Sequence, residues 1–398
     1  MFALLLALAA CAPKEVPSPA GGRPLNLWSV ERDGRQSWLL GTCHFGITLD
    51  AALPPPADHS LRDARVVFAE ADVASVQGME ALNLMWSDAS LSDRLEPAAW
   101  RRLVWRAGAI PATMIDHLPP WVASQLPTIA DAAKAPGGGK GMDLEVLDRA
   151  KARGIPTRFV ETLAQQVELL RGFDDAFLAD LNRPSNPAAE QQATRALTDV
   201  CYGGSEDLAA LLPPDDPATG PLLTRRNAAW MPVIEPELAT GGAFVAVGAA
   251  HMLGDEGLVA RLRARGFTVT RQLTRAPPAA RPPPSDRAPL EVPVKQQAEV
   301  LAWGAQVTPV VVDQVCTEGG LPLTCLFPDR AACVSRLTRD AGLCVEQAEA
   351  DPDGAAARAT RFQGCLLAGA ALEAIVHERI PDSPGCALIT AAVQQMGG

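Results

Sequence analysis

Two of the five histidines in this chain stand in the same sequence context. His44 follows Gly41 by three positions at the end of an apolar run, and His251 follows Gly248 by three positions at the end of another. Ligands of open α/β sheets bind beyond the carboxyl ends of the strands, and glycine lets the chain turn sharply there. The repeated G-x-x-H pattern therefore predicts that both imidazoles line one site. Two histidines that are merely hydrogen-bonded within strand-end turns would give the same pattern.

Carboxylates occupy equivalent positions in the chain. Glu70 and Asp72 follow the short apolar run 64–69, and Glu161 follows the run 156–160. Taken one at a time, such acids are often helix N-caps or solvated turn residues. If the strand ends converge, the shared set is His44, Glu70, Glu161 and His251. Two imidazoles with one or two carboxylates can hold a divalent metal ion with open coordination positions, or can act without metal as acid and base.

The elements that would position these residues alternate between strands and helices. Apolar runs on either side of the turn at Gly34 predict a β-hairpin. Residues 76–135 show helical patterning without a strong strand. Together these features predict an α/β fold, a central mixed sheet with helices on its faces. The predicted strands are 25–30, 37–40, 64–69, 156–160, 243–247 and 267–273, and the predicted helices are 142–153, 163–182, 186–212 and 257–265.

The N-terminus reads as an export signal. Residues 2–10 are uniformly apolar, which is too short for a membrane span but fits the hydrophobic part of a signal peptide. Cys11 directly after Leu-Ala-Ala resembles a bacterial lipobox, so we expect Cys11 to be lipidated and residues 12–24 to tether the protein to a membrane of the bacterial cell envelope. An ordinary signal peptide cut near Cys11 is the alternative.

Six of the nine cysteines lie in the C-terminal part of the chain. In an exported protein this density predicts three disulfides, with a pairing that the sequence leaves open. A metal site is the rival interpretation, but no C-x-x-C pair is present. The Pro-rich residues 276–293 predict a linker, which separates a main domain, 25–275, from a mostly helical domain, 294–398. The six residues are Cys316, Cys325, Cys333, Cys344, Cys365 and Cys386. The expected helices are 298–304, 330–341, 355–372 and 386–396.

The composition limits the classes of partner. The formal net charge is −11, whereas a protein that binds nucleic acid needs a basic face. Tyrosine, phenylalanine and tryptophan are scarce, at 5% together, which also argues against a surface for stacking bases. We therefore expect no nucleic-acid partner.

Residues 25–275 resemble the TraB/GumN family, which is related to the TIKI metalloproteases that cleave extracellular signalling proteins. The two G-x-x-H motifs carry the resemblance, within LWSVERDGRQSWLLGTCHFG and FVAVGAAHMLGDEGLVARLRARGFTV. The stretches VVFAEAD, GMDLEVLDRAKARGIPTRFVET and RRNAAW support it. The C-terminal part of the chain lies outside the resemblance.

The resemblance implies that His44 and His251 lie in the active site, with Glu70 as the matching acidic residue. Arg226 and Asn227 could instead only cap or end a helix. The other matches are Asp143 in the family's GxD stretch, Glu161 in its ET stretch, and Arg226 and Asn227 in its Arg-Asn dipeptide.

Cys43 departs from the family pattern, which usually has an apolar residue there. A thiol beside His44 suggests a nucleophile or an extra metal ligand, although a single cysteine is more often a small buried side chain.

Three functions fit these residues. The first is a metal-dependent hydrolase acting on a peptide or protein, in which His44, Glu70 and His251 hold manganese, cobalt or zinc. In that hypothesis Glu161 is the base and Arg226 binds the developing oxyanion. The second is a metal-free hydrolase that uses the two histidines as acid and base. The third is a non-catalytic lipoprotein that binds metal or haem, or acts through interactions.

Overall fold

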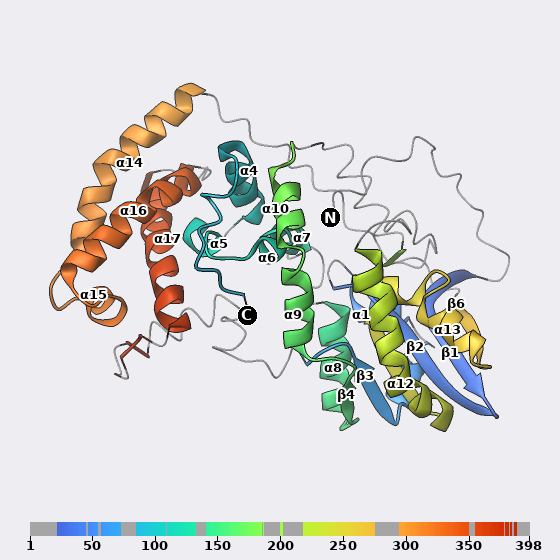
Figure 1. The fold of residues 1–398 in the computed structure, drawn as a ribbon. Coiled ribbons are helices and arrows are strands. Elements are labelled where there is room, and N and C mark those ends of the chain that lie inside the picture. The colour runs from blue at the N-terminus through green and yellow to red at the C-terminus, as the bar shows by residue number, and fades with distance from the viewer. Residues whose placement is uncertain are drawn as a thin grey trace. The chain divides into compact units, whose positions relative to one another are not determined.

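Six strands form one mixed sheet in the order β4-β3-β5-β2-β1-β6 (Figure 1). Strands β2, β5, β3 and β4 run parallel to one another, and β1 pairs antiparallel with both β2 and β6. The α/β fold with a mixed sheet is therefore confirmed. The strands are β1 (Arg23–Arg32), β2 (Arg35–Thr42), β3 (Val66–Ala69), β4 (Thr157–Phe159), β5 (Ala243–Gly248) and β6 (Thr268–Thr274).

The computed structural model describes most but not all of the chain, and contacts divide the chain into two compact units. The first unit contains residues 1–75, 128–176 and 185–286, and the second contains 76–127, 177–184 and 287–398. The described residues are 22–44, 47–54, 57–72, 85–108, 110–132, 141–184, 186, 200–201, 218–274, 294–349, 355–377, 379–381, 383 and 386–387.

The hairpin of β1 and β2 is built as its sequence predicts. Asp33 and Gly34 take positive φ angles of 52° and 72°, which is the two-residue turn whose twist matches that of the paired strands. The turn sets the register in which Arg32 faces Arg35 and Leu27 faces Leu40. On its other edge β2 pairs in parallel with β5.

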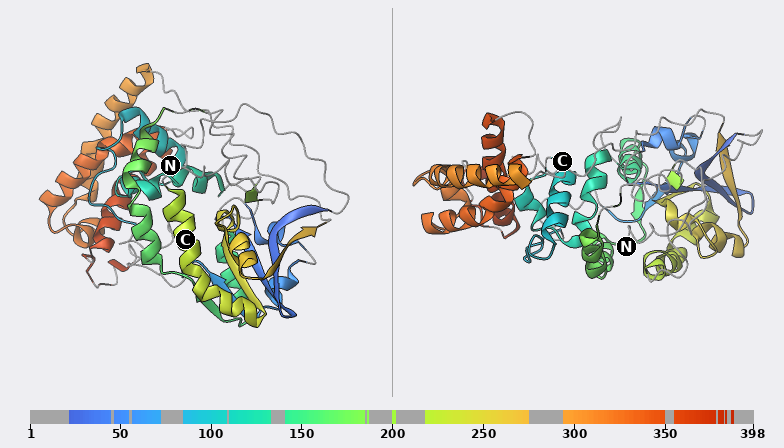
Figure 2. Two further views of the ribbon diagram at one scale, coloured as in Figure 1. Left: turned by 45° about the vertical axis from the view of Figure 1, so that its right-hand side comes forward. Right: turned by 90° about the horizontal axis from the view of Figure 1, so that it is seen from above.

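Helices cover both faces of the sheet (Figure 2). The connections from β2 to β3 and from β3 to β4 pass over one face, through α1, α2 and α8, whereas those from β4 to β5 and from β5 to β6 return over the other, through α12 and α13. Right-handed crossovers impose this arrangement, because the strand order reverses direction. The first-unit elements are α1 (Leu49–Ala52), α2 (His59–Arg62), α8 (Met142–Ala152), α9 (Leu163–Arg171), η3 (Gly220–Thr224), α12 (Arg225–Thr240), η4 (Ala249–Met252) and α13 (Leu258–Ala264).

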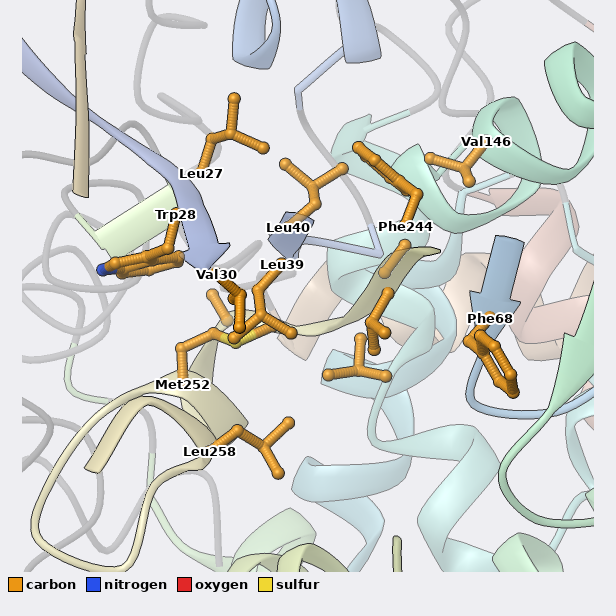
Figure 3. Packing of buried hydrophobic residues seen from close by; sticks show 14 of the residues in the cluster. Leu27, Trp28, Val30, Leu39, Leu40, Phe68, Val146, Phe244, Met252 and Leu258 are labelled. Atoms are coloured by element: carbon orange, nitrogen blue, oxygen red, sulfur yellow. The ribbon is translucent and has the colours of Figure 1, made fainter. Parts of the chain in front are cut away.

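The core of the first unit lies between the sheet and these helices (Figure 3). Leu39, Leu40 and Phe244 on the two central strands are completely buried, as is Val146 on α8. A side chain of this size stabilises the fold by about 1.5–3 kcal/mol when it is fully buried. The two central strands are therefore firmly held, and the turns at their ends start from fixed positions.

The second unit is helical and contains three disulfides in its described residues. The mostly helical, disulfide-rich C-terminal region is thus confirmed, with the pairs Cys316–Cys333, Cys325–Cys386 and Cys344–Cys365. The residue ranges of the two units meet within α7 (Leu126–Ala132) and α10 (Asp174–Asn182). The remaining helices are α4 (Pro97–Ala107), α5 (Ala112–Ile115), α6 (Pro120–Ala123), α14 (Val294–Val315), α15 (Leu321–Leu326), α16 (Arg330–Glu349) and α17 (Ala355–Val376).

The C-terminal helices do not pack only on one another. Helix α17 packs against α5, where the Thr113 hydroxyl donates to the Cys365 carbonyl over 2.5 Å. The Gln347 side chain on α16 bonds both to the Ala112 amide and to the Ile110 carbonyl. Residues 76–127, which lie inside the predicted main domain in sequence, therefore share a packed unit with the C-terminal helices.

Gly369 on α17 tests this packing. A β-carbon at Gly369 would lie 2.5 Å from the Thr113 β-carbon, whereas one at Gly364 on the same helix meets nothing within 4 Å. We expect Gly369→Ala to lower the free energy of unfolding by about 1–3 kcal/mol, because it overpacks this contact. The matched control Gly364→Ala is expected to raise it by about 0.5–1 kcal/mol, because alanine favours a helix. Equal stabilities of the two variants in denaturant unfolding would contradict the contact.

Several predicted features fall outside the described residues: Cys11, the linker 276–293, most of helix 186–212, and helix 386–396 beyond residue 387. Strand β1 begins at Arg23, so the last two residues of the predicted tether belong to the sheet. Among the helices that are described, none has the length and apolarity needed to cross a membrane.

Candidate functional site

The four polar residues predicted at strand ends follow four consecutive strands. His44, His251, Glu70 and Glu161 come directly after β2, β5, β3 and β4, which are neighbours in this order in the parallel part of the sheet. Thr42 pairs with Gly248, so the two G-x-x-H turns leave the sheet at the same level. The chain departs from β2 and β5 toward opposite faces, which is the switch point where open sheets bind ligands.

The glycine of each motif allows a close approach that a larger residue would prevent. A β-carbon at Gly41 would lie 3.0 Å from the Ala249 α-carbon. One at Gly248 would lie 3.2 Å from Glu70 Oε1, the atom that accepts the Gly248 amide proton over 2.7 Å. The glycines thus bring the turn after β5 against β2 on one side and against Glu70 on the other.

Arg226, near the start of α12, is the centre of a largely buried charge cluster. Its Nη2 donates over 2.5 Å both to Glu70 and to Glu161, and its Nε donates to Glu161 over 3.1 Å. Its Nη1 donates to His251 Nε2 over 3.0 Å and to the Leu222 carbonyl over 3.2 Å. A guanidinium has five N–H groups, so each has an acceptor within the protein.

This bonding bears on the roles predicted for the carboxylates. Both oxygens of Glu161 accept from Arg226, and one also accepts from Trp230 Nε1 over 3.1 Å. Glu70 accepts from Gly248, Arg226 and the Gln166 amide. The geometry favours positioning roles for both carboxylates over the predicted role of Glu161 as a base. Burial raises the pKa of Glu70, but the charges of Arg226 and His44 and the hydrogen bond from the Gly248 amide outweigh it and hold that pKa below its usual range.

His251 lies on the short turn η4 and is 4% exposed. The Asn227 amide nitrogen donates to the carbonyls of His251 and Glu256, which leaves its oxygen to accept the His251 Nδ1 proton over 2.7 Å. Nε2 then carries the lone pair that accepts from Arg226. Burial lowers the pKa of His251 to about 3, with Arg226 and His44 acting in the same direction and Glu70 opposing them. The ring is therefore neutral at physiological pH.

His44 differs from His251 in environment. Its side chain is 63% exposed, and its Nδ1 donates a hydrogen bond to Asp143 Oδ2 over 2.6 Å. The other oxygen of Asp143 accepts from the Thr42 hydroxyl. The Asp143 charge raises the pKa of His44 to about 9, so this ring carries a proton at neutral pH. Because Nδ1 is engaged by Asp143, proton transfer to a substrate must use Nε2.

The predicted metal ligands His44, Glu70 and His251 do not form a ligand set as they are arranged. Within the described part of the chain, no three His, Cys, Asp or Glu side chains group as a metal site. Glu70 Oε2 and His251 Nε2 both accept from Arg226, so a guanidinium lies where an ion would need these atoms. The donor set in this arrangement does not fit an ion, and a divalent ion remains a prediction from sequence.

Cys43 is neither a free nucleophile nor an extra ligand, because it forms a disulfide with Cys201. Spacing along the chain gave no sign of this pair, whose cysteines are 158 positions apart. The bridge fixes the residue next to His44 to a segment that is remote in sequence.

Loss of this bridge is expected to destabilise the protein more than loss of a short one. In a chain-entropy description, a 15-residue loop gives about 3 kcal/mol and a 100-residue loop about 4.7 kcal/mol. We therefore expect Cys43→Ala/Cys201→Ala to lower the free energy of unfolding more than Cys316→Ala/Cys333→Ala, whose cysteines are 17 positions apart. Denaturant unfolding under oxidising conditions measures both. A larger loss from the short bridge would contradict the expectation.

Three further residues contribute to the site without a mark in the sequence: Thr42, Gln166 and Trp230. Trp230 lies one turn after Arg226 on α12, with its ring centroid 4.4 Å from that of His251 and 4.7 Å from the Arg226 guanidinium carbon. Residues four apart on a helix lie on the same face, so the position of Trp230 relative to Arg226 is the one sequence feature that indicates this contact. The sequence marks Asp143 only as a motif position, because its bond to His44 depends on how α8 approaches β2.

A family model, described as the TraB/PrgY/GumN family, matches residues 26–271. The matched range contains the six strands except the ends of β1 and β6. It also contains every residue of the strand-end cluster, by which we mean His44, Glu70, Asp143, Glu161, Arg226, Asn227 and His251. Comparisons with curated proteins and with solved structures find no match.

Proposed function

Since the chain belongs to the TraB/PrgY/GumN family, we propose that it hydrolyses a peptide or protein at the strand-end site, with His44 as general acid and His251 as general base. The proposal rests on one observation: two histidines at adjacent strand ends have environments that favour opposite protonation states. Asp143 holds the proton-carrying ring, and Asn227 holds the neutral one. Environments that separate two titrating groups in this way mark an acid and a base.

The proposed reaction starts when a substrate carbonyl oxygen accepts the hydrogen bond that Arg226 Nη1 otherwise donates to His251 Nε2. The freed lone pair of His251 accepts a proton from water as the water oxygen bonds to the carbonyl carbon. His44 Nε2 then gives its proton to the leaving amine as the carbon–nitrogen bond breaks. His251 returns its proton to solvent and His44 regains one, which restores both rings. Arg226 supplies charge at the oxyanion, a contribution of about 3 kcal/mol for one well-placed donor.

The metal-dependent form of the hypothesis remains the first rival. For an ion to be held by His44, Glu70 and His251, Arg226 must break at least its hydrogen bond to the His251 ring. Metal analysis of the active protein separates the metal-dependent form from the metal-free form. A lipoprotein that binds without catalysis is the second rival.

An oxidising compartment is supported by the disulfides, of which the described residues contain four. We propose the bacterial cell envelope, with Cys11 lipidated as the anchor. Mass spectrometry of the protein from its native host tests this, because an unmodified Cys11 in a wholly soluble fraction would contradict it.

A peptide library tests the activity. The wild type is expected to cleave a subset of the library, and His44→Ala and His251→Ala are each expected to lose that cleavage while keeping the circular dichroism of the wild type. His59→Ala is the matched control, because exposed His59 lies against Trp38 outside the strand-end cluster. If both site variants cleave as the wild type does, the proposal is wrong.

A further inference from the structure

We infer that Thr42 is a positioning residue for the His44 proton donor, a role that rests on the proposed function. The Thr42 hydroxyl donates to one oxygen of the Asp143 carboxylate and so holds the side chain of Asp143 in one orientation. In that orientation the other oxygen accepts the hydrogen bond from His44 Nδ1. Thr42, Asp143 and His44 thus form a chain of two hydrogen bonds that starts in the sheet and ends at the reacting ring.

The strand end fixes the position of the Thr42 hydroxyl. Thr42 is the last residue of β2, is 2% exposed and pairs with Gly248 of β5. A β-branched side chain has few rotamers open to it in a strand, so Oγ1 has a defined direction. The hydroxyl donates to Asp143 Oδ1, and the Asp143 Oδ2 atom accepts from His44 Nδ1 over 2.6 Å.

Contacts of the neighbouring residues fix the position of the Asp143 backbone. The Met142 amide donates to the Cys43 carbonyl over 3.2 Å, and a β-carbon at Gly141 would lie 2.3 Å from the His44 carbonyl oxygen. The start of α8 is therefore pressed against the backbone of the G-x-x-H turn. With its backbone fixed, Asp143 can still rotate its side chain. The Thr42 hydroxyl limits this rotation, because it donates a hydrogen bond to the carboxylate oxygen that does not bond to His44.

A purely structural role is the competing explanation, since a buried hydroxyl needs a partner in any case. The two roles differ in what the loss of the hydroxyl does. Thr42→Val keeps the shape and removes the donor, whereas Thr42→Ser keeps the donor. A structural role predicts lower stability with an unchanged His44, whereas a positioning role predicts an altered His44 bond.

The test combines a spectroscopic and a kinetic measurement on the full chain. In the wild type, NMR is expected to show a slowly exchanging, low-field Nδ1 proton for His44, assigned by its disappearance in His44→Ala. Thr42→Val is expected to lose or weaken this signal and to lower kcat for the cleaved library peptide by about 100-fold with little change in KM, because misplaced groups cost about that much. Thr42→Ser is expected to restore both, and Asp143→Asn to abolish the signal.

The outcomes separate this inference from the proposed function. An unchanged Nδ1 signal and unchanged kcat in folded Thr42→Val would overturn the positioning role while leaving hydrolysis in place. A signal that is lost in Thr42→Val and regained in Thr42→Ser, in a protein that cleaves no peptide, would support the positioning role and overturn the proposed function. Failure of Thr42→Ser to restore the signal would assign the effect to packing and also overturn the role.

Discussion

Replacement of Arg226 by methionine is expected to lower the free energy of unfolding by about 3–5 kcal/mol, because it leaves two buried carboxylates without their cation. The side chains of Glu70 and Glu161 are only 11% and 10% exposed, so water compensates little of the loss. Denaturant unfolding at neutral pH measures the change. Arg226→Lys is expected to recover part of the loss, because an ammonium keeps the charge but cannot bond both carboxylates through a planar fork.

A triple variant provides the control for this prediction. Arg226→Met combined with Glu70→Gln and Glu161→Gln removes the whole charge cluster and is expected to be far more stable than Arg226→Met alone. Breaking a buried ion cluster is costly, whereas replacing it by neutral groups of similar shape is often neutral. If Arg226→Met unfolds at the same denaturant concentration as the wild type, Arg226 is not the centre of the cluster.

Substitution of either histidine is expected to lower kcat/KM by about 100- to 10,000-fold, the usual contribution of a positioned acid or base. The wild-type rate is expected to be flat through the neutral range and to fall at high pH. The sign follows from the role of His44, which as an acid acts only while protonated and whose pKa is about 9. The low pKa of His251, about 3, keeps this base neutral across the same range.

The pH profile distinguishes the two possible roles of His44. If His44 is the base, the rate rises tenfold per pH unit up to about pH 9 and then levels, which is the opposite of the expected profile. His59→Ala serves again as the control and is expected to keep the wild-type profile. A rate that increases through pH 9 in the wild type would exchange the roles of the two histidines.

The strand ends of the site could be predicted because they depend on local sequence. Apolar runs followed by glycine mark β2 and β5, and parallel neighbours place His44 and His251 at one edge. The bonds of Arg226 could not be predicted in the same way. They join α12 to turns that lie 65 and 156 positions earlier in the chain, and periodicity carries no information about which distant groups meet.

The division of the chain shows the same limit. The Pro-rich stretch before residue 294 suggested a boundary, yet Thr113 and Gly369 belong to one packed unit. Helical patterning indicates that two segments have apolar faces, but the partner of each face depends on shape, such as the missing side chain at Gly369. The Cys43–Cys201 bridge could not be predicted either, because two cysteines pair only when the fold brings them close together.

The most direct test of the central claim is the hydrolysis rate of chelator-treated protein, measured on a peptide that the wild type cleaves, with metal content determined on the same sample. The rate is expected to stay at the untreated level while the metal content falls well below one ion per chain, and His44→Ala and His251→Ala are expected to be inactive under the same conditions. A rate that disappears with chelation and returns on addition of manganese, cobalt or zinc would contradict the metal-free acid–base mechanism.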